Sequence, residues 1–405
     1  MDAYTLKPLL DGKRLAKELS AKPGPWMKDA LEVVMAWQLR NPDTATVEGA
    51  IEEMKNARMH GELTASLTTH FLRLTIRPLF SKNQHPAVTA QGRKVTTNVL
   101  PKNLSMEQWD EVTKPWKKDE CALDILRWIL NNIDEKAVEQ HWPLLLPPLL
   151  SITDDTDTKF KAQGCHLISL LLQHTPPSLL TRTGLSEVFE GALLPCLGYL
   201  PTLTPADECI ALLSEAYPAL ISLSRTMQDP GRRSSTNEDQ TPRRVKLLDT
   251  VVRKGVLSAY VNCSENVDIV EVLSRNLGLL VNELGVESTK HLKHVLPMLS
   301  TVLSNPFGHA HPSSLLAATN ALQTVILNGW PRMAVNKGEV LKSITLCWLH
   351  IHGEQSVELE EVRKELRKTV LMLKDAVGPD HSLQIDFKAL SDADPRLADL
   401  FETGE

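Results

Sequence analysis

The sequence predicts an all-α fold, in which a solenoid of stacked helix pairs follows a small separate helical unit. Hydrophobic residues make up 42% of the chain but aromatic residues only 5%. This leucine-rich balance suits packed helices better than a β-sandwich. Apolar residues recur at spacings of three and four, without sustained alternation. The apolar stripes also come in pairs, about every 40 to 55 residues, as a repeat architecture requires.

The clearest pair lies in residues 142–173. Its first apolar stripe starts at Trp142-Pro143, with proline in the expected first turns, and stops at the acidic turn Asp154-Asp155. The second stripe begins at Lys159, after Asp155-Thr156-Asp157, and we expect an aspartate of this group to cap its N-terminus. Helix, acidic turn and helix is the layout of a HEAT-type unit. One such unit cannot bury its apolar face alone, so its neighbours should repeat it.

Two residues of the second stripe carry further information. Gly164 lies inside the expected helix, where glycine costs about 1 kcal/mol relative to alanine. We therefore expect that its helix packs closely on the preceding one. Cys165 follows within the same apolar pattern and, like Cys209 and Cys347, is predicted to be a small buried side chain.

The chain divides into four predicted parts. They are a helical unit at 1–60, a helix with a long basic connection at 63–118, HEAT-like repeats at 119–390 and a tail at 391–405. Within the repeats, residues 228–242 lack apolar side chains, so this insertion is predicted to be disordered.

The remaining helices are predicted from apolar spacing, proline and glycine stops and capping residues. Before the repeats they span 6–19, 26–40, 44–59, 63–74 and 105–113. Among the repeats they pair as 189–200 with 205–223, 245–260 with 266–284, 289–303 with 312–327 and 338–350 with 356–377.

Charge is unevenly distributed along the chain. The net charge is −6, which does not favour nucleic acid or anionic lipid as partners. Residues 73–118 nevertheless carry nine Lys and Arg against three Asp and Glu, whereas residues 119–157 carry nine acids against two bases. Such stretches are most often solvated surface, and the alternative is a pair of complementary faces that select partners.

The cysteines and the apolar runs bear on cellular location. The six cysteines include no CxxC pair, and no signal peptide is recognisable, so a reducing compartment, cytoplasmic or nuclear, is expected. The longest nearly continuous apolar run is about nine residues, far short of the roughly 20 that span a bilayer.

No catalytic, metal or cofactor site is predicted. Asp155-Thr156-Asp157 resembles a carboxylate pair that holds magnesium, but capping of the following helix explains it better. The pairs His291/His294 and His350/His352 lack further ligands at zinc spacing. Phosphate-binding loops and hydrolase signatures are missing from the sequence. Ser234 and Ser235, after two arginines, are possible phosphorylation sites.

Several separated blocks point to one family. They are Arg77-Pro78-Leu79-Phe80, Gly92-Arg93-Lys94, Pro115-Trp116-Lys117, Trp142-Pro143 through Asp154-Asp155, and Lys161 with Gly164. In this order they resemble the second branch of the Tel-two-interacting proteins, HEAT-like subunits of the Triple T complex, over about residues 63–405. Whether each position is structural or contacts a partner is left open.

The resemblance implies a non-enzymatic adaptor without cofactors. Its expected partners are the Tel-two and Tti-one subunits, which are HEAT-repeat proteins. Through them the adaptor would reach the ninety-kilodalton heat-shock chaperone, which matures the phosphatidylinositol-3-kinase-related kinases.

Residues 6–58 resemble a different family. Lys7-Pro8-Leu9-Leu10-Asp11-Gly12-Lys13, Lys22-Pro23-Gly24-Pro25-Trp26 and Trp37-Gln38-Leu39 are similar to the C-terminal end of fungal CCA-adding tRNA nucleotidyltransferases. The catalytic head of that family is absent from the sequence, so the resemblance implies a tRNA-binding fragment at most. A gene model that joins two neighbouring genes would explain both resemblances.

Overall fold

The computed structural model describes residues 26–41, 46–81, 86–95, 114–227, 242–378 and 383–401. In this part of the chain the regular elements are all helices, and β-pairing is limited to one isolated bridge between Val88 and Lys94. The all-α prediction is therefore confirmed. Three predictions concern residues that lie wholly or mostly outside the described ranges. They are the helices at 6–19 and 105–113 and the disorder at 228–242.

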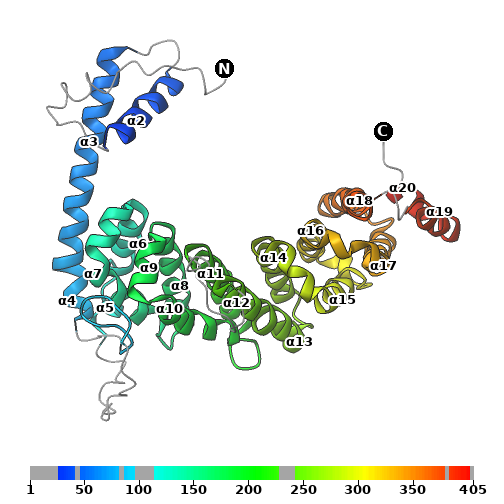
Figure 1. The fold of residues 1–405 in the computed structure, drawn as a ribbon. Helices are drawn as coiled ribbons and strands as arrows, with labels where there is room; N and C mark the ends of the chain where they lie inside the picture. Colours follow the sequence, from blue (N-terminus) through cyan, green and yellow to red (C-terminus); the bar gives the residue numbers. More distant parts are fainter. Residues whose placement is uncertain are drawn as a thin grey trace, which may run out of the picture.

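Five helix pairs are stacked one after another (Figure 1). The second helix of each pair packs on the second helix of the next, and this layer consists of α8, α11, α14, α16 and α18. One hydrophobic core runs through the stack from Leu72 to Leu400. This packing is that of an α-solenoid, as predicted, while the HEAT-like type of the repeats stays a prediction.

Apart from the start of α7, the bounds of the pairs are close to those predicted from the sequence periodicity. The pairs are α7 (Glu135–Thr153) with α8 (Thr158–Gln173); α10 (Ser186–Leu193) and η4 (Leu194–Gly198) with α11 (Ala206–Thr226); α12 (Arg243–Thr250), η5 (Val251–Leu257) and α13 (Ser258–Cys263) with α14 (Val267–Leu284); α15 (Leu292–Leu303) with α16 (Pro312–Gly329); and α17 (Met333–Ile351) with α18 (Val357–Val377).

Shorter elements connect and flank the pairs. They are α5 (Pro115–Lys118), α6 (Ala122–Asn132), α9 (Pro177–Thr183), η6 (Gly285–His291), η7 (Gly308–Ala310), η8 (Trp330–Arg332), α19 (Gln384–Ala393), η10 (Pro395–Leu397) and α20 (Ala398–Phe401). The described helices include none that is long and apolar enough to cross a bilayer.

One continuous helix precedes the pairs, where two were predicted. It consists of α3 (Val47–His70), the π-helical η1 (Phe71–Ile76) and α4 (Arg77–Phe80), and α2 (Trp26–Arg40) packs beside it away from the stack (Figure 1). The predicted break at residues 60–62 is wrong because Gly61 is the only weak helix former there, and one glycine costs only about 1 kcal/mol. Thr46 caps this helix by accepting from the Gly49 N–H.

The end of this helix is anchored on the first pair. Leu72, Ile76 and Phe80 are buried against it. The Thr69 hydroxyl lies 3.3 Å from Nε2 of His141 on α7. Burial, together with the nearby Arg73 guanidinium, lowers the pKa of His141, so this histidine is a neutral hydrogen-bonding partner at pH 7.

Helix α7 begins earlier than predicted. Asp134 caps it by accepting from the Ala137 N–H, and the helix therefore starts at Glu135 instead of Trp142. The three prolines Pro143, Pro147 and Pro148 consequently lie inside the helix and not in its first turns. The capping residue Asp134, eight residues before Trp142, decided the boundary. The tertiary contacts of this largely buried helix outweigh the missing proline N–H groups.

The close approach predicted at Gly164 is confirmed. A Cβ atom on Gly164 would lie 2.5 Å from the Thr153 side-chain oxygen and 2.6 Å from the Thr153 backbone nitrogen. Any side chain at this position would collide with α7. Glycine is thus required by the packing of α8 on α7.

The predicted burial of the cysteines is also confirmed for Cys165, Cys209 and Cys347. The sulfur atoms of Cys165 and Cys196 lie 3.7 Å apart in the core. The Cys165 thiol donates a hydrogen bond to the Cys196 sulfur, and this bond together with burial raises the pKa of Cys165. Burial raises the pKa of Cys347 to about 12. The thiols of Cys165 and Cys347 are therefore protonated, and they pack as small hydrophobic groups.

Candidate functional site

The motif blocks that are far apart in the sequence meet around α7 and α8. Phe80 stacks on Trp116, with ring centroids 5.5 Å apart, and Trp116 meets the edge of Phe160 at 5.2 Å. Phe80 ends the long helix, Trp116 lies on α5 and Phe160 lies in the first turn of α8. The three rings join three segments into one apolar cluster.

Residues 86–95 are held on α7 by a glycine and a tryptophan. Nε1 of Trp142 donates to the Gly92 carbonyl oxygen at 3.1 Å in a buried contact. Gly92 has φ of 70°, and a Cβ atom there would lie 2.9 Å from the Trp142 ring. Both the left-handed backbone and the close ring require glycine at this position.

Asp155 carries the electrostatic contact of this cluster. Its carboxylate is 1% exposed and lies 2.6 Å from Nζ of Lys114 and 2.9 Å from Nζ of Lys117. Burial alone would raise its pKa, but hydrogen bonds from Lys114, from the Asp157 N–H and from Lys117 outweigh that effect and lower it. Asp155 is therefore ionised at pH 7 and holds α5 against the turn between α7 and α8.

The same turn explains two further motif residues. Asp157 accepts from the Lys159 N–H and caps α8, as predicted. Nζ of Lys161, which is almost fully buried, donates to the Thr153 carbonyl oxygen at 2.7 Å and lies 5.5 Å from the centroid of the Tyr199 ring. Lys161 thus satisfies a carbonyl group at the end of α7, where a cation also suits the helix dipole.

The predicted site residues fall into two groups by exposure. Phe80, Gly92, Trp142, Asp155, Lys161 and Gly164 are buried in the cluster, and Pro143 is half-buried. Arg77, Pro78, Arg93 and Asp154 are exposed. The buried group has contacts within the chain that account for its residue types. Only the exposed group is accessible to another protein.

Part of the predicted basic stretch is engaged within the chain. Lys114 and Lys117 bind Asp155, and Lys94 pairs with Glu187 at the start of α10. The basic stretch and the acidic stretch of residues 119–157 are thus partly complementary to each other. The charge left for partners is smaller than the sequence count suggests.

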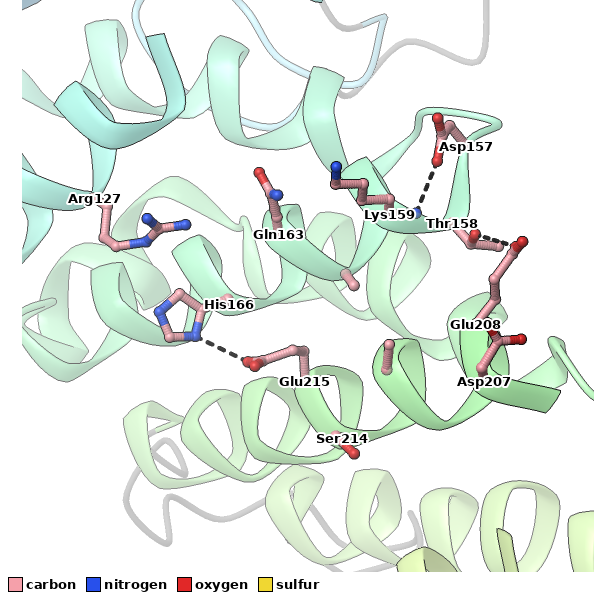
Figure 2. A pocket seen from close by; sticks show the side chains of 12 residues that line it. Arg127, Asp157, Thr158, Lys159, Gln163, His166, Asp207, Glu208, Ser214 and Glu215 are labelled. Atoms are coloured by element: carbon pink, nitrogen blue, oxygen red, sulfur yellow. Dashed lines mark hydrogen bonds and ion pairs between the residues drawn. The ribbon is translucent and has the colours of Figure 1, made fainter. Parts of the chain in front are cut away.

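A groove of about 770 Å³ lies between α8 and α11, with α6 at one end (Figure 2). Two polar bonds cross it. The Thr158 hydroxyl donates to Glu208 at 2.5 Å, and Nδ1 of His166 lies 2.9 Å from Glu215. The remaining charged lining residues are Arg127, Asp157, Lys159 and Asp207.

The groove has an excess of negative charge. Its four carboxylates outnumber Arg127 and Lys159, and its lining includes the small residues Ala162 and Ala211. Sequence analysis missed this groove, although a signal exists in the repeat period. The bonded partners across it are 50 and 49 residues apart, which falls within the predicted repeat interval.

The histidine pairs are not brought together into a metal site. His291 lies 2.8 Å from Asp249, whereas His294 is exposed. Among the described residues no group of three His, Cys, Asp or Glu side chains could hold a metal ion. Ser234 and Ser235 lie outside the described ranges, so their proposed phosphorylation stays a prediction.

Stacked helix pairs, one continuous core and a polar groove define a helical-repeat protein, a class that presents long surfaces to other macromolecules. A sequence model of the Tti2 family matches residues 36–310. The chain belongs to the Tti2 family. The match begins before residue 63, where the resemblance was expected to start, and so includes the continuous helix that crosses this position.

Individual relatives support both resemblances. TELO2-interacting protein 2 of Homo sapiens is 21% identical over 263 residues, which are 65% of this chain and 49% of that protein. Nucleotidyltransferase lcsQ of Purpureocillium lilacinum is 54% identical over 57 residues, 14% of this chain and 10% of that protein. The tRNA nucleotidyltransferase cca2 of Schizosaccharomyces pombe is 40% identical over 52 residues, 13% of this chain and 10% of that protein.

The chain thus spans about half the length of its human relative and about a tenth of each nucleotidyltransferase. No solved structure matches the chain significantly.

Proposed function

We propose that this chain is a non-enzymatic scaffold subunit of the Triple T complex. One observation carries the proposal. The family's motif blocks, which are separated in the sequence, meet in one cluster on the first helix pair, within the segment that matches the Tti2 family. The cluster supports the proposal because it fixes the orientation of the long helix and of residues 86–95 on the solenoid. The exposed residues Arg77 and Arg93 of these two segments are our candidates for partner contact.

The partners that we propose are the Tel-two subunit, which the name of the human relative includes, and the Tti-one subunit, which the sequence resemblance implies. A pull-down with the full chain as bait should recover both subunits. The double variant Arg77→Glu, Arg93→Glu should recover less, and recovery by the parent chain should weaken with added salt because exposed ion pairs are screened. A matched control is Lys374→Glu, Lys388→Glu, two exposed cations near the other end of the stack.

If the parent bait is folded by circular dichroism and recovers neither subunit, the proposal is wrong. If the two double variants lose recovery equally, the assignment of contact to Arg77 and Arg93 is wrong, while the subunits remain partners.

We further propose that, through these subunits, the chain supports the ninety-kilodalton heat-shock chaperone in maturing phosphatidylinositol-3-kinase-related kinases, in the cytoplasm, the nucleus or both. Depletion of the chain should lower the steady-state amounts of these kinases without lowering their transcripts. Unchanged kinase amounts after depletion would argue against this role.

A second candidate function rests on the 54% identity to a nucleotidyltransferase over a short segment. In that case the chain would bind tRNA. Incubation of the full chain with tRNA lacking its 3′ end, CTP and ATP should give no extension.

A joined gene model would explain the short segment, and sequencing of cDNA across residues 58–66 tests it. A transcript that reads through this region would support a true fusion.

A further inference from the structure

Two neighbouring helices on the side of the stack opposite to α14 and α16 are held parallel and in register. The first is the continuous helix formed by α12, η5 and α13, and the second is η6 with α15. Asp249 binds Nζ of Lys290 at 2.6 Å and Nε2 of His291 at 2.8 Å. Further along, Tyr260 hydrogen-bonds to Thr301. The step from Asp249 to Tyr260 is eleven residues, as is the step from Lys290 to Thr301, so both helices run in the same direction.

This register brings four cationic or titratable side chains together. Arg253 and Lys254 lie one turn beyond Asp249, and Lys293 and His294 lie one turn beyond Lys290 and His291. All four side chains are exposed. Within the described part of the chain, none of them forms an ion pair, and the two carboxylates of these helices, Asp249 and Glu287, are paired with Lys290 and His291.

The π-helical segment η5 fixes how Arg253 and Lys254 are presented. A Cβ atom on Gly255 would lie 2.8 Å from a Leu197 methyl carbon and 3.4 Å from the Tyr217 hydroxyl. Val251, Val252 and Val256 are buried on the same inner side. The close contact of Gly255 therefore locks the rotation of the helix, and Arg253 and Lys254 point outward together. π-helical turns inside longer helices are frequent at functional positions.

We propose that Arg253, Lys254, Lys293 and His294 form a docking surface for an acidic segment of a partner polypeptide. Three cations and one histidine, without ion pairs among the described residues, lie on a chain with a net charge of −6 and make this surface locally opposite in sign to the whole protein. Exposed apolar groups continue it, namely Val261, which is 78% exposed, and Pro297. An acidic polypeptide with an adjoining apolar residue complements both parts, whereas a nucleic acid backbone would need a longer run of cations.

The test uses the full chain, and the probe is a short fluorescein-labelled peptide of Asp, Glu and Ala with one terminal Leu. The charge-reversal variant is Arg253→Glu, Lys254→Glu, Lys293→Glu. The matched control is Lys118→Glu, Lys374→Glu, Lys388→Glu, which changes the net charge equally at exposed lysines elsewhere. Binding is measured by fluorescence anisotropy at two salt concentrations, and folding of each variant by circular dichroism.

The parent and the control should bind with similar Kd, and the charge-reversal variant should bind at least about tenfold more weakly, which corresponds to about 1.4 kcal/mol. The difference should shrink as salt is added. A neutral variant, Arg253→Gln, Lys254→Gln, Lys293→Gln, should fall between the parent and the charge reversal.

Equal weakening in the variant and the control would overturn the proposal, as would undetectable binding by the parent. Tighter binding of a single-stranded oligonucleotide of the same charge than of the peptide would also overturn it, in favour of a nucleic-acid surface.

Discussion

The indole nitrogen of Trp142 donates a hydrogen bond to the main-chain oxygen of Gly92, fifty residues earlier in the chain, at 3.1 Å. This bond holds residues 86–95 on α7. Next to it, Lys114 and Lys117 hold α5 on the turn that follows α7. The first helix pair is thus the point where segments that precede the solenoid are attached to it.

Replacing Trp142 with Phe should loosen residues 86–95 more than it lowers overall stability. The Gly92 carbonyl would lose its buried donor, at a cost of about 1–3 kcal/mol. Hydrogen exchange should accelerate at the amides of Gly92 and Lys94, which donate to Thr89 and Thr183. Trp348→Phe is the matched control, because Trp348 donates to the Arg396 carbonyl at 2.8 Å and its loss should affect only the C-terminal end. Unchanged exchange at Gly92 would contradict the anchoring role.

Gly164→Ala should destabilise the protein although alanine favours helix. The new methyl group would be 2.5 to 2.7 Å from atoms of Thr153, two of which belong to the backbone. Overpacking of this kind costs about 1–3 kcal/mol, which exceeds the helix propensity gain of about 1 kcal/mol over most of that range. Thermal unfolding measures the effect. Gly338→Ala in α17, where a Cβ atom meets nothing within 4 Å, should leave Tm unchanged or raise it. If both variants raise Tm equally, close packing at Gly164 is not limiting.

Asp155→Asn should lower stability at pH 7 by about 3–5 kcal/mol, because two lysines would lose a buried counter-charge. The pKa of Asp155 is lowered in the folded protein, so its contribution is fully present above the ordinary aspartate value of 3.8. The contribution is lost as the pH falls from that value through the lower pKa of the folded state. Urea unfolding at pH 7 and pH 3 should therefore show a smaller difference between the parent and the variant at pH 3. Asp375→Asn, at an exposed position, is the control. A gap that stays constant with pH would contradict the lowered pKa.

Glu283→Gln should weaken the contact between the second and third helix pairs. The carboxylate of Glu283 binds Arg225 of α11 at 2.5 Å and Arg244 of α12 at 2.6 Å, and its side chain is 10% exposed. Because the arginines are partly exposed, we expect a loss of about 1–3 kcal/mol, less than for a fully buried pair. The midpoint of urea unfolding should fall, and Glu287→Gln, whose side chain is 60% exposed, should leave it nearly unchanged. Equal midpoints for the two variants would show that the Glu283 bridges add no net stability.

Local signals predicted some boundaries well and others poorly. The caps at Thr46 and Asp157 and the end of α18 at Gly378 follow directly from residue type, because a capping side chain or a glycine at positive φ acts on its own backbone. The start of α7 was misplaced because its prolines were assigned to the first helical turns, whereas Asp134 caps the helix eight residues before Trp142. The continuity of α3 through Gly61 was missed because a single glycine is a weak stop.

The sequence by itself determined the all-α class, the paired helices and their period, because amphipathic spacing and capping are properties of neighbouring residues. It also identified Gly164 as a close contact. Only the tertiary structure decided that Lys114 and Lys117 neutralise Asp155, that Gly92 meets Trp142, and that Asp249 pairs with Lys290. The residues of each pair are about 40 or more positions apart in the sequence. Which helix faces meet depends on how whole repeats stack, and side chains throughout the common core contribute to that stacking.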